Sequence, residues 1–284
     1  MLSLCRTQQV MMGISNKIRS RLETYYLSAS SRIKNRLPLR KIVKWDCNQF
    51  VLLTENLYER NHASFFLQKE RHTVGWVKKC FRQGDIVFDV GANVGHITLF
   101  ISKQFKDDIN IYAIEPSYTN FSKLKQNLII NSCHNVRAFN LAFADTNEIG
   151  EFFYKNIGPG RSQHTISRKM NKDGIAFNIL LKDAVLILTL DTFIDLFNIP
   201  CPNHIKMDVD GAEDMIIQGM KKVLANEKLR SINIEVTGNV SKHEAVLNKL
   251  KDYKFQLFQE HVHNNGSEFY TSDYYFLRKG SSSI

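Results

Sequence analysis

The sequence has little that would indicate a disulfide framework, a zinc ribbon or a membrane-spanning segment. Its five cysteines are scattered, odd in number and form no Cys-x-x-Cys pair, a pattern that fits a reducing compartment. No uninterrupted apolar run approaches the ~20 residues that cross a bilayer. The N-terminus also lacks the compact apolar core and small-residue cleavage site of a signal peptide. We therefore expect a cytoplasmic protein.

Excess positive charge is missing from most of the chain and is concentrated at the N-terminus. The net charge is +10, and residues 1–44 contain ten lysines and arginines against one acid, so this arm carries +9 and the remainder +1. Apolar residues at helical spacing from Met11 to Tyr25 predict a short basic amphipathic helix in the arm. We favour a solvated arm or a helix packed on the body; contact with a membrane surface and organelle targeting are the alternatives.

Beyond the arm, the hydrophobic period changes repeatedly, which predicts strands alternating with helices. We expect an N-terminal extension over residues 45–83 that packs on or caps the fold, and a main domain over 84–284. The extension combines a strand pair within 41–54 and a helix over 60–82. The main domain combines strands 86–90, 111–114, 136–143, 205–209, 232–236, 255–258 and 274–277 with helices 96–105, 118–131, 212–225 and 241–252. This order predicts a mostly parallel sheet covered on both faces, with the last two strands antiparallel.

The most informative motif joins the first strand of the main domain to its first helix. Asp89 lies near the carboxyl end of the strand, and Gly91, Asn93 and Gly95 form the turn into the helix. Glycines allow a tight turn, and the free amides at a helix start can receive a polar ligand group. A dinucleotide site usually has a third glycine where Asn93 stands, so the loop favours another ligand.

Two further acids follow the next two predicted strands. Glu115 follows the second strand, about 20 residues beyond the glycine loop, where a carboxylate can accept both hydroxyls of a ribose. Asp145 follows the third predicted strand, where it can accept a hydrogen bond from an adenine amino group. Acids at three successive strand ends predict a nucleoside site.

These stretches, D-V-G-A-N-V-G, I-E-P, L-A-F-A-D and K-M-D-V-D-G-A-E, resemble the FkbM family of S-adenosylmethionine-dependent methyltransferases over about residues 84–260. The resemblance implies a class I methyltransferase-like, doubly wound α/β sheet of about seven strands, mostly parallel with an antiparallel last strand. It makes 84–284 a methyltransferase domain with S-adenosyl-L-methionine as cofactor. Asp89, Gly91, Asn93 and Gly95 would surround the methionine part, Glu115 the ribose and Asp145 the adenine. Characterised members are mostly O-methyltransferases of sugar or polyketide hydroxyls.

Methyl transfer to a hydroxyl requires alignment of the acceptor and removal of its proton, which directs attention to acids and histidines near the strand ends. Asp208 closes the fourth strand, Glu235 closes the fifth, and His164 lies in a polar loop. We take these three as the candidate catalytic residues. A cluster of Asp208, Asp210, Glu213 and Glu235 can hold a divalent metal, but acids at a helix start are also favoured by the helix dipole, and we do not favour a metal.

The sequence therefore predicts a methyltransferase that O-methylates a hydroxyl of a saccharide or similar small-molecule or glycan acceptor. A catalytically silent cofactor-binding or scaffold protein with the same fold is the alternative, and a dinucleotide oxidoreductase is disfavoured by Asn93. Enzymes that methylate the amino groups of bases usually have an N-P-P-Y-like stretch after the fourth strand, and cytosine-C5 enzymes need a cysteine nucleophile there. This chain has no such stretch, and its Cys201 precedes the strand, so a nucleic-acid acceptor is disfavoured. The near-neutral charge of residues 45–284 also argues against a phosphate-tracking surface.

Overall fold

A computed structural model describes residue 21 and residues 40–55, 57–106, 108–160, 166, 179–263 and 269–280. The chain divides into two compact units, Met1–Lys41 and Ile42–Ile284. The predicted helix in residues 11–25 and the candidate base His164 lie outside the described residues. The helices and strands described below belong to the second unit, except that its first strand begins two residues earlier, at Arg40.

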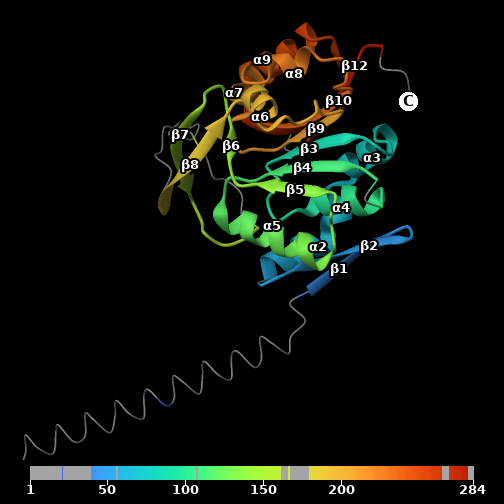
Figure 1. Cartoon of the computed structure of the whole chain (residues 1–284), viewed down its shortest axis with the longest axis vertical. Helices are drawn as coiled ribbons and strands as arrows, with labels where there is room; N and C mark the ends of the chain where they lie inside the picture. Colours follow the sequence, from blue (N-terminus) through green and yellow to red (C-terminus); the bar gives the residue numbers. More distant parts are fainter. Residues whose placement is uncertain are drawn as a thin grey trace, which may run out of the picture. The chain divides into compact units, whose positions relative to one another are not determined.

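A seven-stranded sheet forms the centre of this unit, in the order β11-β12-β10-β9-β3-β4-β5 (Figure 1). The strands are β3 (Ile86–Val90), β4 (Asn110–Ile114), β5 (Val136–Phe139), β9 (His204–Met207), β10 (Ser231–Asn239), β11 (Phe255–Val262) and β12 (Phe269–Arg278). β3, β4, β5, β9 and β10 pair in parallel, whereas β12 is antiparallel to both β10 and β11. The predicted doubly wound sheet with an antiparallel last strand is confirmed.

Helices cover both faces of the sheet, as Figure 1 shows. The helices are α4 (His96–Gln104), α5 (Tyr118–Ile130), α6 (Leu190–Phe197), α7 (Glu213–Gln218), α8 (Lys221–Ala225) and α9 (Val240–Asp252). One core joins β3, β9 and β10 to α6–α9, and a second joins β3 and β4 to α4, α5 and the N-terminal extension. Strands buried on both faces read as mostly apolar runs, which explains why β3, with the sequence I-V-F-D-V, could be predicted. Within the described residues, no helix is both long and apolar enough to cross a membrane.

The N-terminal extension folds as a hairpin of β1 (Arg40–Trp45) and β2 (Asn48–Leu53), followed by helices α2 (Leu57–Lys69) and α3 (Arg71–Cys80). The hairpin is fixed to α5, because Asn131 Oδ1 accepts from Val51 N at 2.7 Å and Asn127 Oδ1 accepts from Leu53 N at 2.9 Å. The single helix predicted over 60–82 is wrong: the chain turns at Glu70, which has φ −92° and ψ 19°. This turn matters for the site, because it points the Glu70 carboxyl towards the sheet.

The strand predicted over 136–143 is also divided in two. β5 ends at Phe139, where the side-chain amide of Asn140 donates to the carbonyls of Glu115 and Pro116 at 2.8 and 2.9 Å. The chain then leaves the main sheet, and β6 (Ala142–Phe143) pairs with β8 (Leu181–Leu188) in a three-stranded sheet that includes β7 (Glu148–Tyr154). Asp145 therefore follows β6 of the small sheet and not the third strand of the large one.

The helix predicted over 212–225 is likewise two helices, α7 and α8. The break lies at Gly219, where an added Cβ would come within 2.0 Å of the carbonyl oxygen of Ala144. The close approach of these two backbones requires glycine and holds α7 against the start of the small sheet.

Candidate cofactor and acceptor site

The loop between β3 and α4 is shaped by three residues with left-handed backbone conformation. Gly91, Asn93 and Gly95 have φ of 80°, 51° and 94°. A Cβ on Gly91 would lie 1.8 Å from the carbonyl oxygen of Asp208, so only glycine allows the loop to cross the end of β9. Asparagine tolerates the left-handed region, and here Asn93 Oδ1 accepts from Val94 N at 2.8 Å. The register places the loop beside Asp208, whose amide donates to the carbonyl of Val90 at 3.0 Å.

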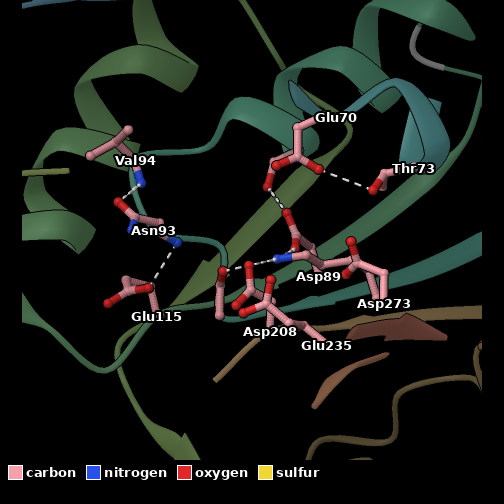
Figure 2. A network of polar contacts seen from close by, with 12 residues as sticks. Glu70, Thr73, Asp89, Asn93, Val94, Glu115, Asp208, Glu235 and Asp273 are labelled. Atoms are coloured by element: carbon pink, nitrogen blue, oxygen red, sulfur yellow. Dashed lines mark hydrogen bonds and ion pairs between the residues drawn. The ribbon is translucent and has the colours of Figure 1, made fainter. Parts of the chain in front are cut away.

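Glu115, directly after β4, is fixed to the same loop. Its Oε2 accepts from Asn93 N at 2.8 Å (Figure 2). Its Oε1 accepts from Ser117 N at 2.9 Å. Burial raises the pKa of Glu115 to about 7, although the backbone hydrogen bonds from Ser117 and Asn93 act to lower it. Each carboxylate oxygen has a second lone pair, so Glu115 can still accept hydrogen bonds from a ligand diol.

Two cavities open at the carboxyl ends of β3, β4 and β9. The first, which we call the apolar cavity, measures about 100 Å³ and includes Ile114, Glu115, Phe143, Phe152 and Ile216 in its wall. The second, which we call the acidic cavity, measures about 250 Å³ and includes Glu70, Lys206, Asp208, Asp210 and Glu235. Both are lined by Gly91, Asn93, Asp208 and Asp210, so the two cavities meet at the glycine loop and the end of β9. This is the crevice of an open α/β sheet where ligands usually bind.

Lys206 is the cation at the centre of the acidic cavity. Its Nζ lies 3.2 Å from Asp208 Oδ2 and 3.7 Å from Asp89 Oδ1, and it donates to the carbonyl of Gly91 at 3.3 Å. Although burial alone would lower it, the carboxylates of Asp208, Asp89 and Glu70 raise the pKa of Lys206. The lysine is therefore charged, and it holds the end of β9 to the loop after β3.

Asp89 lies behind the loop between β3 and α4. It is 0% exposed, and its Oδ2 accepts from the Thr98 hydroxyl at 2.5 Å. Asp89 is therefore a buried partner of Lys206 and of Thr98 on α4. A direct contact between Asp89 and a methionine group stays a prediction.

The carboxylates around Lys206 outnumber it. Figure 2 shows Glu70, Asp89, Asp208, Glu235 and Asp273 near one another, and they come from the turn between α2 and α3, from β3, from the end of β9, from β10 and from β12. Glu235 and Asp273 are direct cross-strand partners of β10 and β12, an arrangement of like charges that destabilises a sheet. Asp208, burial and Asp273 raise the pKa of Glu235 to about 10. The Glu235 carboxyl therefore holds its proton at neutral pH.

His263 approaches the same carboxylates from the end of β11. Its Nε2 lies 2.8 Å from Asp273 Oδ2 and 3.9 Å from Glu235 Oε2, and Asp273 raises its pKa. The ligand atoms of these three residues lie within 4.8 Å of one another, a spacing that a metal ion could bridge. His263 is not among the site residues predicted from the sequence.

Of the remaining predicted acids, the structure separates two from the site and brings three together. Asp145 is exposed, and the apolar cavity is lined near it by Ala142 and Phe143 instead. Glu213 is buried and forms an ion pair with Lys242 at 2.7 Å, which removes it from the predicted carboxylate cluster. Asp208, Asp210 and Glu235 do come together around the acidic cavity.

One wall of the acidic cavity comes from α2, where sequence analysis expected no functional residue. Tyr58, His62 and Phe66 line it together with His96 from α4. The rings of Tyr58 and His62 are 4.9 Å apart, and those of Phe66 and His96 are stacked at 5.6 Å. Burial lowers the pKa of His96 to about 3, so this ring is neutral. The only sequence signal was the aromatic residues at positions 58, 62 and 66, spaced four apart, which also suits an ordinary core face.

The FkbM methyltransferase domain family matches residues 89–257, which is more than half of the chain. The chain belongs to the FkbM methyltransferase family. The match begins at Asp89 and includes the glycine loop, Glu115, Lys206, Asp208 and Glu235, whereas α2 lies outside it.

A comparison with curated proteins gives no match. Among solved structures, the chain is similar to precorrin-6y C5,15-methyltransferase from Geobacter metallireducens GS-15, with 12% identity, a TM-score of 0.45, and coverage of 75% of this chain and 88% of that one. It is similar to TYW2 from M. jannaschii in complex with AdoMet, with 14% identity, a TM-score of 0.42 and coverage of 84% and 87%. It is also similar to magnesium protoporphyrin IX methyltransferase from Synechocystis PCC 6803 with bound SAM, with 10% identity, a TM-score of 0.45 and coverage of 92% and 96%.

The residues fit S-adenosylmethionine, the cofactor expected for the family. The apolar cavity offers Phe143, Phe152 and Ile216 for a flat base, with Glu115 at hand for the two ribose hydroxyls. The neighbouring acidic cavity offers Asp208, a carboxylate that suits a sulfonium, and Asp210, a carboxylate that suits an α-ammonium group. When bound, the cofactor supplies an electrophilic methyl group.

Proposed function

We propose that this methyltransferase O-methylates a hydroxyl of a saccharide or a similar polyhydroxyl acceptor. The cofactor would span the two cavities, with its nucleoside beside Glu115 and its methionine part along Gly91 and Asn93. The acceptor would enter the acidic cavity, which is the larger of the two.

The observation that carries the proposal is the position of Asp208. It lines both cavities, and its side chain is 44% exposed, so it can reach an acceptor while Lys206 holds it from behind. A carboxylate at that point can orient a hydroxyl and accept its proton as the oxygen is methylated. Glu235 and His164 remain further candidates for this role, and Asp145 remains a candidate for the adenine amino group.

The acceptor cavity favours hydroxyl chemistry over a nucleic-acid acceptor. The carboxylates of Asp208 and Asp210 would repel a phosphate backbone, whereas carboxylates accept hydrogen bonds from sugar hydroxyls. The aromatic wall of α2 offers rings on which the apolar face of a pyranose can pack.

The experiment combines binding and turnover. The purified protein should bind S-adenosylhomocysteine in calorimetry and, with methyl-labelled cofactor, produce methyl ethers from a panel of mono- and oligosaccharides. We expect Asp208→Asn to lower kcat by about 10²- to 10⁴-fold, the usual contribution of general acid–base catalysis. Its affinity for S-adenosylhomocysteine should change little, because the amide keeps the size of the side chain.

The outcomes separate the competing functions. Absence of S-adenosylhomocysteine binding would contradict the cofactor assignment. Binding without turnover on any acceptor would favour a catalytically silent scaffold. Label that appears on nitrogen, carbon or RNA would replace the O-methylation of a saccharide.

A further inference from the structure

The turn between β9 and α7 carries Asp210, which lines both cavities. Asp210 and Gly211 have left-handed backbone conformation, with φ of 41° and 109°. A residue other than glycine is uncommon in this region, and the contacts around the turn must hold it there. The shape of the turn therefore decides where the Asp210 carboxylate lies at the junction of the two cavities.

Glu213 and Lys242 hold both backbone groups of Gly211. Glu213 Oε1 accepts from Gly211 N at 2.8 Å, and Glu213 Oε2 accepts from Lys242 Nζ at 2.7 Å. The same ammonium group donates to the carbonyls of Gly211 at 3.4 Å and of Thr237 at 3.1 Å. These three acceptors match the three N–H groups of a lysine. Two side chains thus tie the turn to α9 and to β10.

Gly238 makes room for the Lys242 side chain beside the end of β10. A Cβ at Gly238 would lie 2.7 Å from Lys242 Cδ and 3.1 Å from Lys242 Cβ, closer than atoms can pack. The backbone of Lys242 is also fixed, because Asn239 Oδ1 accepts from Lys242 N at 3.0 Å in the first turn of α9. Lys242 is therefore held at its backbone, along its stem and at its ammonium group.

We propose that Glu213 and Lys242 are positioning residues for cofactor binding, which hold the turn so that the Asp210 carboxylate meets the amino-acid part of S-adenosylmethionine. Among the described residues that line the two cavities, neither Glu213 nor Lys242 is found, so both act through the turn. The nucleoside is expected beside Glu115, and its binding should depend much less on the turn. This inference rests on the cofactor of the family and is independent of the acceptor proposed above.

The test compares two ligands that differ in the amino-acid part. S-adenosylhomocysteine has it, whereas 5′-methylthioadenosine keeps the nucleoside and the sulfur and lacks it. Calorimetry on the full chain would measure the first directly and the second by displacement of the first. We expect Lys242→Met to weaken S-adenosylhomocysteine about tenfold, as the loss of one charge-assisted hydrogen bond would. Methylthioadenosine should bind almost as it does to the wild type.

Arg230→Met provides a matched control for lost stability. The Arg230 side chain is 25% exposed and pairs with buried Asp85, much as Lys242 is 23% exposed and pairs with buried Glu213. Arg230 and Asp85 directly precede β10 and β3, at the opposite ends of the strands from the cavities. Arg230→Met should therefore lower Tm and leave the S-adenosylhomocysteine affinity of the folded protein unchanged.

A second variant tests the turn itself and serves if Lys242→Met does not fold. An added Cβ at Gly211 has open space around it, so Gly211→Ala removes no contact and acts only through the left-handed backbone. It should also weaken S-adenosylhomocysteine more than methylthioadenosine.

Several results would overturn the inference. Wild-type affinity for S-adenosylhomocysteine in Lys242→Met or Gly211→Ala would do so, as would an equal loss in Arg230→Met. Equal weakening of both ligands would show general damage to the site instead of a misplaced Asp210. Absence of S-adenosylhomocysteine binding by the wild type would overturn it together with the cofactor assignment.

Discussion

At the scale of single residues, Glu115 shows how one carboxyl can serve both the fold and a ligand. Its two oxygens hold the amides of Asn93 and Ser117, and these bonds connect the glycine loop to the end of β4. Burial places its pKa at about 7, within the range where many assays are run. Protonation near neutral pH would take away one of its acceptor sites.

We predict that cofactor affinity depends on this carboxyl and therefore on pH. S-adenosylhomocysteine should bind more tightly as the pH rises from about 6 to about 8, because the ionised form accepts both ribose hydroxyls. Glu115→Gln should weaken binding by about tenfold or more and remove the pH dependence, measured by calorimetry at matched ionic strength. Wild-type affinity in Glu115→Gln would contradict the ribose assignment.

At the scale of secondary-structure elements, the pairing of β10 with β12 decides the electrostatics of the acceptor side. The register places Glu235 opposite Asp273, and the parallel neighbour β9 ends at Asp208 beside them. Strand β12, which is antiparallel and lies between β10 and β11, thus brings Asp273 to the site, and His263 reaches it from the end of β11.

We predict that this pairing costs stability at high pH. The pKa of Glu235 is raised from about 4.5 to about 10 in the folded state. Between these values the folded protein holds a proton that the unfolded chain has released, so stability falls as the pH rises through that window. Glu235→Gln should flatten the decline of Tm between about pH 6 and about pH 9, while the surface variant Glu151→Gln should follow the wild type. An identical decline in Glu235→Gln and wild type would show that Glu235 is ionised throughout.

At the scale of the whole molecule, the charge of the arm and the chemistry of the site are separate properties. Residues 1–44 carry +9 of the total charge of +10, whereas the site is built within the compact unit Ile42–Ile284 and is acidic. We therefore propose that the basic arm bears on location and the acidic cavity on the acceptor.

We predict that deletion of residues 1–38 leaves S-adenosylhomocysteine affinity unchanged, because β1 begins at Arg40 and the hairpin is held by Asn127 and Asn131. If the arm contacts anionic membranes, the same deletion should reduce co-flotation with phosphatidylserine-containing liposomes. Flotation that does not change on deletion would count against a membrane role for the arm.

The sequence by itself determined the strand–helix alternation, the glycine loop and the acids at the ends of β3, β4 and β9. These follow from local patterns: the mostly apolar runs of β3 and β4 indicate buried parallel strands, and left-handed turns need glycine or asparagine. Only the tertiary structure decided that Asn140 ends β5 early, so that Asp145 follows β6 of the small sheet, and that Glu213 pairs with Lys242. It also brought α2, His263 and Asp273 to the cavity, because strand register and helix docking depend on contacts between residues far apart in the chain, which no local pattern records.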